Sequence, residues 1–251
     1  MIELIVEDGI ARLSLVRPEA RNAISLAGWG EIEAAVGGAE AQGARLLLLS
    51  GSPGGPFCAG ADISDFDRFR DDPAARTSFR LALRACLDRL SAVPIPTVAL
   101  VEGACYGAGA ALAMACDLRF AGPDAAFAIT PAKLGISYPQ EDVHRLVSLV
   151  GPGQAARLLF SAQSIDGAEA ERIGLVDRFY PEGMEEAVQS FAAAVLLNDR
   201  ESLAILKRSI ALAERGKVTD EDQDRAFDQL LGSDALHERL LAYRSRSRER
   251  S

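Results

Sequence analysis

The chain has 251 residues, of which 49% are hydrophobic and 25% charged, and this is the composition of a folded globular protein. Its 36 acidic residues exceed its 27 basic ones, which gives a net charge of −9 at pH 7 and argues against nucleic acid or an anionic membrane as partner. No segment has the roughly 20 apolar residues of a membrane span, and the first residues lack a secretory signal pattern, so we expect a cytoplasmic protein.

Cysteine and histidine, the usual ligands of zinc, are few and scattered along the chain. The four cysteines are Cys58, Cys86, Cys105 and Cys116. They form no Cys-x-x-Cys pair, and only two histidines are present. We therefore expect reduced thiols that serve as small apolar side chains, no metal site and no bound cofactor.

The N-terminal part of the chain predicts strands and a helix in succession. Asp8-Gly9 is flanked by apolar segments at 2–7 and 10–16, which is the strongest short signal for a β-hairpin. The serine that begins 25–42 can cap an alanine-rich helix over that range. Residues 45–50 form a short apolar run, typical of a strand that is buried on both faces.

The same pattern then repeats. A small-residue loop at 51–60 leads to a helical stretch that Asp62 opens, and apolar positions at helical spacing predict a helix over 74–92. The next elements are a buried strand, a second small-residue loop and a short helix, at 97–101, 103–109 and 110–116. Alternation of strands and helices up to about residue 180 indicates parallel βαβ units.

Beyond residue 182 only helical periodicity remains. We therefore divide the chain into an α/β core, residues 1–190, and a helical C-terminal region, residues 191–251, whose expected role is the assembly of subunits. The helices of this last part are expected near 182–197, 200–214, 219–231 and 234–247.

Two segments share one design, in which a buried strand, a loop of glycine and alanine and a helix start follow one another at 46–63 and 98–112. The first N–H groups of a helix have no partner within the helix, and small side chains let a ligand approach them. If the two loops lie side by side, they offer a pair of N–H donors for a developing oxyanion. The small residues could instead serve only the close packing of helix on sheet, and both interpretations stay open at this point.

Five segments carry motifs: Arg-Pro-Glu-Ala-Arg-Asn-Ala at 17–23, Phe-Cys-Ala-Gly-Ala-Asp-Ile at 57–63, and the stretches 101–118, 127–146 and 173–177. Taken in order, they resemble the signatures of the crotonase (enoyl-CoA hydratase/isomerase) superfamily over nearly the whole chain. The resemblance implies a spiral of βαβ turns with C-terminal trimerisation helices, assembled as a homotrimer or a dimer of trimers. It also implies acyl-CoA thioesters as substrates, as in fatty acid metabolism, with coenzyme A (CoA) as part of the substrate and no separate cofactor.

The resemblance also implies roles for single residues by their position in these motifs. The oxyanion donors would be the backbone N–H groups of Ala61 and Ala108. Lys133 would be a surface charge or a charge near the CoA phosphates. Asp62 has a second interpretation as the N-cap of a helix. The residues implied to border CoA are Ala20, Arg21, Ala59, Asp62 and Ile63.

The chain departs from the family pattern at the two glutamates with which hydratases move protons. In an alignment without gaps, Ala111 stands at the position of the first glutamate and Pro131 at that of the second, and neither side chain can transfer a proton. We therefore expect a lyase or isomerase that carries out isomerisation or decarboxylation rather than standard hydration. The alternative is a non-catalytic acyl-CoA-binding protein on the same fold.

Groups that could replace these glutamates occur in the segment that follows. Tyr138 resembles an active-site tyrosine of the branch that includes methylmalonyl-CoA decarboxylase, although that branch has a histidine where Ala61 stands here. Tyr138 could orient a carboxylate or a thioester oxygen, or it could serve packing. Glu141 or Asp142 could be a catalytic base, or could be favourable negative charge at a helix N-terminus.

Overall fold

The computed structural model describes residues 2–249, with side-chain surroundings for residues 2–245. The chain divides into two compact units, Met1–Leu196 and Leu197–Ser251. The boundary expected after residue 190 falls inside helix α6, which spans Met184–Leu197. Within the described residues, no helix has both the length and the apolar character needed to cross a membrane.

The expected hairpin opens the first unit. Strand β1 (Ile2–Glu7) pairs antiparallel with β2 (Ile10–Leu15), and the two residues between them, Asp8 and Gly9, have φ values of 49° and 79°. Both values lie in the left-handed region that a two-residue hairpin turn of this kind requires. The hairpin prediction is confirmed.

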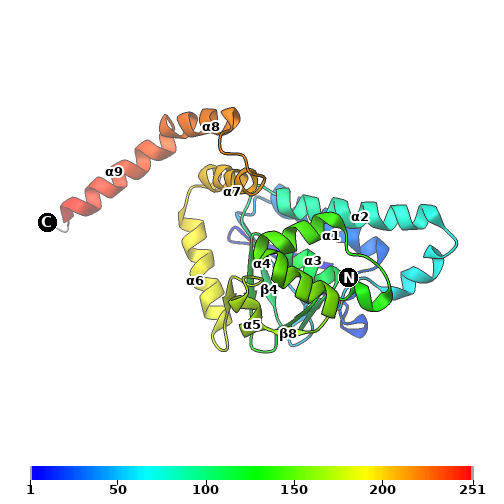
Figure 1. Cartoon of the computed structure of the whole chain (residues 1–251). Helices are drawn as coiled ribbons and strands as arrows, with labels where there is room; N and C mark the ends of the chain where they lie inside the picture. Colours follow the sequence, from blue (N-terminus) through cyan, green and yellow to red (C-terminus); the bar gives the residue numbers. More distant parts are fainter. Residues whose placement is uncertain (1, 250–251) are drawn as a thin grey trace. The chain divides into compact units, whose positions relative to one another are not determined.

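A six-stranded sheet forms the centre of the first unit (Figure 1). Its strand order is β1-β2-β3-β4-β6-β9, and every pair after the hairpin is parallel. The four leucines of β3 are all buried, as expected for a strand that is covered on both faces. The remaining strands of this sheet are β3 (Leu46–Ser50), β4 (Thr97–Val101), β6 (Leu118–Ala121) and β9 (Arg178–Phe179).

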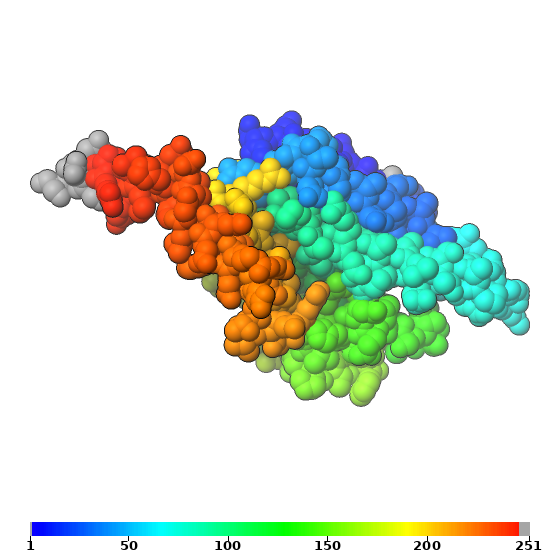
Figure 2. Space-filling model, turned by 90° about the horizontal axis from the view of Figure 1, so that it is seen from above, coloured from blue at the N-terminus to red at the C-terminus, as the bar shows by residue number. Residues whose placement is uncertain are grey.

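Two capped helices follow the first strands. Ser25 accepts the N–H of Gly28 at 3.2 Å and begins α1 (Leu26–Ala41), and the carboxylate of Asp72 caps α2 (Pro73–Ala92) in the same way. Helix α1 packs against the hairpin and against α2, and Figure 2 shows the blue surface of α1 beside the cyan surface of α2. Both helix predictions are confirmed, because local capping residues define where each helix begins.

A second sheet has three short strands in the order β5-β7-β8, and its strand β5 packs against helix α3. The prediction of a loop over 103–109 is wrong at β5, which pairs in parallel with β7. Strands of two or three residues are too short to show alternation in the sequence. The short elements of this region are β5 (Ala104–Tyr106), α3 (Ala108–Met114), β7 (Ala126–Ala128), β8 (Ile165–Asp166) and α5 (Gly167–Arg172).

Helix α4 (Gln140–Ser161) is interrupted at Gly151, whose φ of 74° is not helical and which precedes Pro152. Three short 3-10 helices complete the first unit, at Pro18–Ala20, Ile63–Phe69 and Pro131–Leu134. The helical stretch expected after Asp62 is therefore a 3-10 helix rather than an α-helix.

The C-terminal part is helical, as predicted. The carboxylates of Asp199 and Asp220 accept backbone N–H groups and begin the first two helices of the second unit. These helices expose many apolar side chains, including Phe227, which is 62% exposed. The helices are α7 (Arg200–Glu214), α8 (Glu221–Leu231) and α9 (Asp234–Glu249).

Candidate active site

The two small-residue loops lie side by side. Cys58 and Cys105 are partners in a short parallel bridge. The N–H of Cys58 donates to the carbonyl of Ala104 at 2.9 Å, and its carbonyl accepts from the N–H of Tyr106 at 2.9 Å. Gly109 in α3 makes this approach possible, because a Cβ there would lie 2.5 Å from the Cys58 carbonyl oxygen. The small residue thus serves close packing, and this packing is also what brings the two loops together.

Within the described chain, the backbone N–H groups of Ala61 and Ala108 make no hydrogen bond. Ile24 bridges to Ala61, yet it bonds to the neighbouring residues: it donates to the carbonyl of Gly60 (2.8 Å) and accepts from the N–H of Asp62 (2.9 Å). Strand geometry therefore turns the N–H of Ala61 to the opposite side. Ala108 is the first residue of α3, where an N–H has no partner within the helix. A Cβ at Gly60 would lie 3.7 Å from the nitrogen of Ala108, so the two loops meet here.

Gly107 forms the turn that leads into α3. Its φ of 51° and ψ of −113° are favoured by glycine alone, and a Cβ would lie 3.0 Å from Oγ1 of Thr130. Its N–H donates to the carbonyl of Ala128 at 2.9 Å. Its carbonyl accepts two hydrogen bonds, one from the N–H of Ala111 (3.1 Å) and one from the hydroxyl of Tyr138 (2.9 Å). Hydrogen bonds to both the N–H and the carbonyl of Gly107 thus hold the turn in place.

Tyr138 lies beneath this turn and is only 8% exposed. Burial raises the pKa of its hydroxyl well above the ordinary value, and the nearby negative charge of Asp142 raises it further. The hydroxyl therefore stays protonated at neutral pH. It donates to the Gly107 carbonyl, so the structure ties Tyr138 to the turn itself.

The two acidic residues at the start of α4 have different surroundings. The carboxylate of Asp142 is fully buried, and its oxygen lies 3.2 Å from the guanidinium of Arg145 and 3.8 Å from that of Arg84. Burial raises the pKa of Asp142, and the two arginines offset part of this effect. Arg145 also donates to the hydroxyl of Ser91 at 3.0 Å, which ties α4 to α2. The side chain of Glu141 is 60% exposed, and its carboxylate lies 3.8 Å from Arg84.

Ala111 and Pro131, which are expected to stand at the positions of the hydratase glutamates, carry no titratable group. Ala111 is 1% exposed within α3, and Pro131 begins the last 3-10 helix. Lys133 is exposed on that 3-10 helix. Among the described residues, the side chains of Lys133 and Glu141 make no hydrogen bond or ion pair with either small-residue loop. No cluster of three or more potential metal ligands occurs in the described part of the chain.

The segment expected to border CoA adjoins the first loop. The carbonyl of Arg21 accepts the N–H of Ala59 at 3.0 Å. Ala20 is partly exposed at the end of the preceding 3-10 helix. The side chain of Ile63 is 66% exposed, which leaves a large apolar surface open at the end of the loop. The bond between Arg21 and Ala59 therefore joins the 3-10 helix segment to the first loop, and a role of these residues in binding CoA stays a prediction.

Asp62 joins this segment to the loop. Its carboxylate lies 2.6 Å from the guanidinium of Arg17 and accepts the N–H (3.0 Å) and the hydroxyl (2.7 Å) of Ser64. Hydrogen bonds from Ser64 and from Arg17 lower the pKa of Asp62 below its ordinary value. The interpretation of Asp62 as an N-cap is confirmed by its bond to Ser64.

Asn22 also holds the site together, although its place in the motif at 17–23 predicts no role for its side chain. It is fully buried with a φ of 56°, a conformation that asparagine tolerates better than most residues. Its side chain accepts the N–H of Arg17 at 2.8 Å and donates to the carbonyl of Pro56 at 2.7 Å. An asparagine after a Pro-x-x-Arg turn is a signal for a left-handed residue, but its distant partner is not visible in the sequence.

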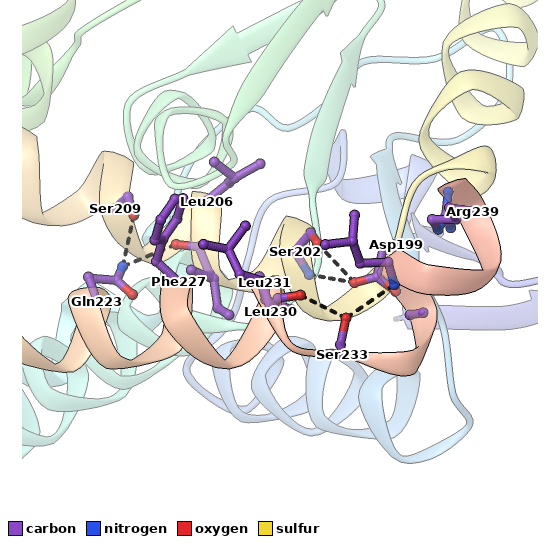
Figure 3. Close-up of a pocket in the computed structure, with 13 residues that line it drawn as sticks. Asp199, Ser202, Leu206, Ser209, Gln223, Phe227, Leu230, Leu231, Ser233 and Arg239 are labelled. Atoms are coloured by element: carbon purple, nitrogen blue, oxygen red, sulfur yellow. Dashed lines mark hydrogen bonds between the residues drawn. The ribbon is translucent and has the colours of Figure 1, made fainter. Parts of the chain in front are cut away.

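The second unit carries an open groove of about 360 Å³ (Figure 3). Its wall is mainly apolar, and Leu206, Phe227 and Leu231 are each more than half exposed. At one end, the amide of Gln223 donates to the hydroxyl of Ser209 at 2.9 Å. A groove with this much exposed apolar surface is typical of a contact with another molecule.

Comparisons with known proteins agree with this architecture. A family model described as "Enoyl-CoA hydratase/isomerase" matches residues 6–244. The chain is 33% identical over 244 residues to the "Probable enoyl-CoA hydratase echA6" of Mycobacterium tuberculosis, which covers 96% of this chain and 95% of the relative. It is 34% identical to the crotonyl-CoA hydratase of Syntrophomonas wolfei, over 88% of this chain and 84% of the relative.

A solved structure shows the same fold. The enoyl-CoA hydratase/isomerase family protein from Hyphomonas neptunium superimposes with a TM-score of 0.92 at 34% identity, over 98% of this chain and 95% of that one. The crotonase-like fold expected from the sequence, an α/β body with a helical C-terminal region, is thereby confirmed.

Proposed function

The chain belongs to the enoyl-CoA hydratase/isomerase family of acyl-CoA enzymes, and we propose that it forms a thioester enolate whose oxygen is held by the N–H groups of Ala61 and Ala108. The observation that carries this proposal is the pair of unbonded N–H groups in adjacent loops. Fixed donors aimed at a developing oxyanion stabilise it strongly, and each is worth about 10²–10³-fold in rate. The chemistry needs no cofactor besides the CoA of the substrate.

We further propose that the reaction is isomerisation or decarboxylation rather than standard hydration, because Ala111 and Pro131 cannot activate water or deliver a proton. In isomerisation, one base removes a proton from C2 of a 3-enoyl thioester, the electron pair passes to the thioester oxygen, and a proton returns at C4. In decarboxylation, the bond between Cα and the carboxylate breaks, the pair passes to the same oxygen, and Cα then takes a proton. The second route needs no base for the bond-breaking step.

Turnover by the purified protein tests this proposal. We expect the protein to convert one of two thioesters, trans-3-hexenoyl-CoA or methylmalonyl-CoA. Hydration of crotonyl-CoA should be far slower than that conversion. Glu141→Gln distinguishes the two routes, because only isomerisation needs a base. Glu141 is the exposed acidic residue at the start of α4. This variant should abolish isomerisation if Glu141 is the base, and leave decarboxylation unchanged. Binding without turnover of any of the three thioesters would instead support the non-catalytic acyl-CoA-binding protein.

The role of the backbone donor is tested with Ala108→Pro. Ala108 is the first residue of α3, a position where proline is well tolerated, so the variant removes the N–H without breaking the helix. We expect the rate to fall by about 10²–10³-fold. Ala108→Gly keeps the N–H and is the matched control. Equal rates in the two variants would contradict the assignment.

We also propose that the groove of the second unit receives another copy of the chain, in a homotrimer or a dimer of trimers. The exposed apolar side chains around Phe227 support this proposal, because subunit interfaces bury such surfaces. Phe227→Asp places a charge in the groove and should shift the protein to monomers in sedimentation velocity. An unchanged sedimentation coefficient would contradict this location for the interface.

A further inference from the structure

The hydrogen bond of Tyr138 reaches the proposed oxyanion donor through a single peptide group. The Tyr138 hydroxyl donates to the carbonyl oxygen of Gly107 at 2.9 Å. That carbonyl and the N–H of Ala108 belong to the same planar peptide unit, and in a trans peptide they point in opposite directions. Whatever fixes the carbonyl of Gly107 therefore fixes the direction of the Ala108 N–H.

This peptide is polarised as well as oriented. The Gly107 carbonyl accepts a second hydrogen bond from the N–H of Ala111 at 3.1 Å, so both of its lone pairs can be engaged. Hydrogen bonds to an amide oxygen draw electron density toward it and make the N–H of the same amide a stronger donor. The glycine itself has no side chain with which to hold this unusual backbone conformation.

Tyr138 is held in place for this contact. It is followed by Pro139, whose carbonyl accepts the N–H groups of Asp142 and Val143 at the start of α4. The same helix is tied to α2 by the bond from Arg145 to Ser91 and by the buried carboxylate of Asp142, which lies 3.8 Å from the guanidinium of Arg84 in α2. Burial keeps the Tyr138 hydroxyl protonated through its raised pKa, so it is a constant donor over the neutral range.

We propose that Tyr138 is a positioning residue that orients and polarises the Ala108 N–H through the carbonyl of Gly107. This role rests on the proposed function, in which that N–H binds the thioester oxygen. It differs from direct contact with the substrate, because the hydroxyl is buried on the opposite side of the peptide.

The test uses Tyr138→Phe, which removes the hydroxyl and keeps the ring. The Gly107 carbonyl keeps its bond to Ala111, so we expect the variant to fold. We expect kcat to fall about 5–10-fold, the effect of one net hydrogen bond, and KM to change less than twofold. Tyr180→Phe is the matched control, because the ring of Tyr180 packs on Phe120 of β6, and this variant should leave kcat unchanged.

A spectroscopic measurement distinguishes positioning from general loosening of the fold. Butyryl-CoA labelled with ¹³C at the thioester carbonyl has no double bond to isomerise and no carboxylate to lose. Its carbonyl stretch in isotope-edited infrared spectra should move to lower frequency on binding to the unmodified protein. Tyr138→Phe should bind the labelled thioester with the same Kd within twofold, but the carbonyl stretch should shift less than it does in the unmodified protein.

A double variant supplies the decisive comparison. If Tyr138 acts through the Ala108 N–H, adding Tyr138→Phe to Ala108→Pro should produce no further loss of kcat or of infrared shift. Additive losses would overturn the inference, as would a full infrared shift in Tyr138→Phe. If the unmodified protein binds the labelled thioester without any shift, the proposed function fails instead, so the two failures are distinguishable.

Discussion

Gly109→Ala is the substitution that most directly tests how the two loops are placed. Gly109 lies in the first turn of α3 against the backbone of Cys58. An added Cβ would lie 2.5 Å from the Cys58 carbonyl oxygen, 2.7 Å from its Cβ and 3.0 Å from its Sγ. The first two atoms belong to the backbone and to the base of the side chain, so no rotamer change relieves the overlap.

The size of the effect follows from these distances. Ordinary contact begins near 3.4 Å, so the Cys58 carbonyl must recede by about 0.9 Å (3.4 − 2.5). Overpacking of this kind costs up to about 3 kcal/mol, and the better helix propensity of alanine returns about 1 kcal/mol. We expect the free energy of unfolding to fall by about 2 kcal/mol. If the two proposed oxyanion donors move apart by the same amount, the rate should fall by about 100-fold.

Two assays and one control measure these effects. Urea unfolding gives the free energy, and turnover of the thioesters named above gives the rate. Gly30→Ala is the matched control, because Gly30 lies in helix α1 and an added Cβ would have no neighbour within 4 Å. It should stabilise the protein by up to about 1 kcal/mol and leave the rate unchanged. If Gly109→Ala behaves like Gly30→Ala in both assays, the loops are not in tight contact and the reasoning is refuted.

Two further substitutions and one labelling experiment have expected outcomes. Asn22→Ala leaves buried polar groups unpaired and puts alanine at positive φ, so urea unfolding should show a loss of about 3 kcal/mol; a loss below 1 kcal/mol would contradict this. Hydrogen bonds from Ser64 and Arg17 lower the pKa of Asp62, so its ionised carboxylate stabilises the fold above the ordinary carboxyl pKa of about 3.9. Asp62→Asn should therefore lower the free energy of unfolding at pH 7, and the difference from the unmodified protein should vanish as the pH falls through the lowered pKa. A difference that persists in acid would exclude these contacts of the Asp62 carboxylate as its source. Burial raises the pKa of Cys58 to about 12, so about one in ten thousand of these thiols is ionised at pH 8, and mass spectrometry should find alkylation by iodoacetamide only after unfolding.

The elements that the sequence predicts well are those whose ends depend on neighbouring residues. Ser25 caps α1 through Gly28, three residues away, and the expected helix differs from the observed one by about a residue at each end. The hairpin turn at Asp8 and Gly9 is equally local. The helix expected over 200–214 coincides with α7.

The contacts that build the site join residues that are far apart in the sequence. The bond from Tyr138 to Gly107 joins residues 31 positions apart, and the bridge from Ile24 to Ala61 joins two segments separated by a helix and a strand. Which segments meet depends on how the chain crosses the sheet, and no periodicity records it. The sequence therefore suggests two donor loops, and only the structure shows that one tyrosine supports one of them.

Both proposed oxyanion donors are backbone N–H groups, and this is compatible with alanine at 111 and proline at 131 in a chain that keeps the family architecture. The N–H of Ala61 is available because strand pairing alternates, and that of Ala108 because a helix begins there. Neither donor depends on the side chain at its position. Alanine at 111, which cannot transfer a proton, is therefore compatible with both proposed oxyanion donors. A search for the reaction should thus start from thioesters whose enolates form with one base or with none.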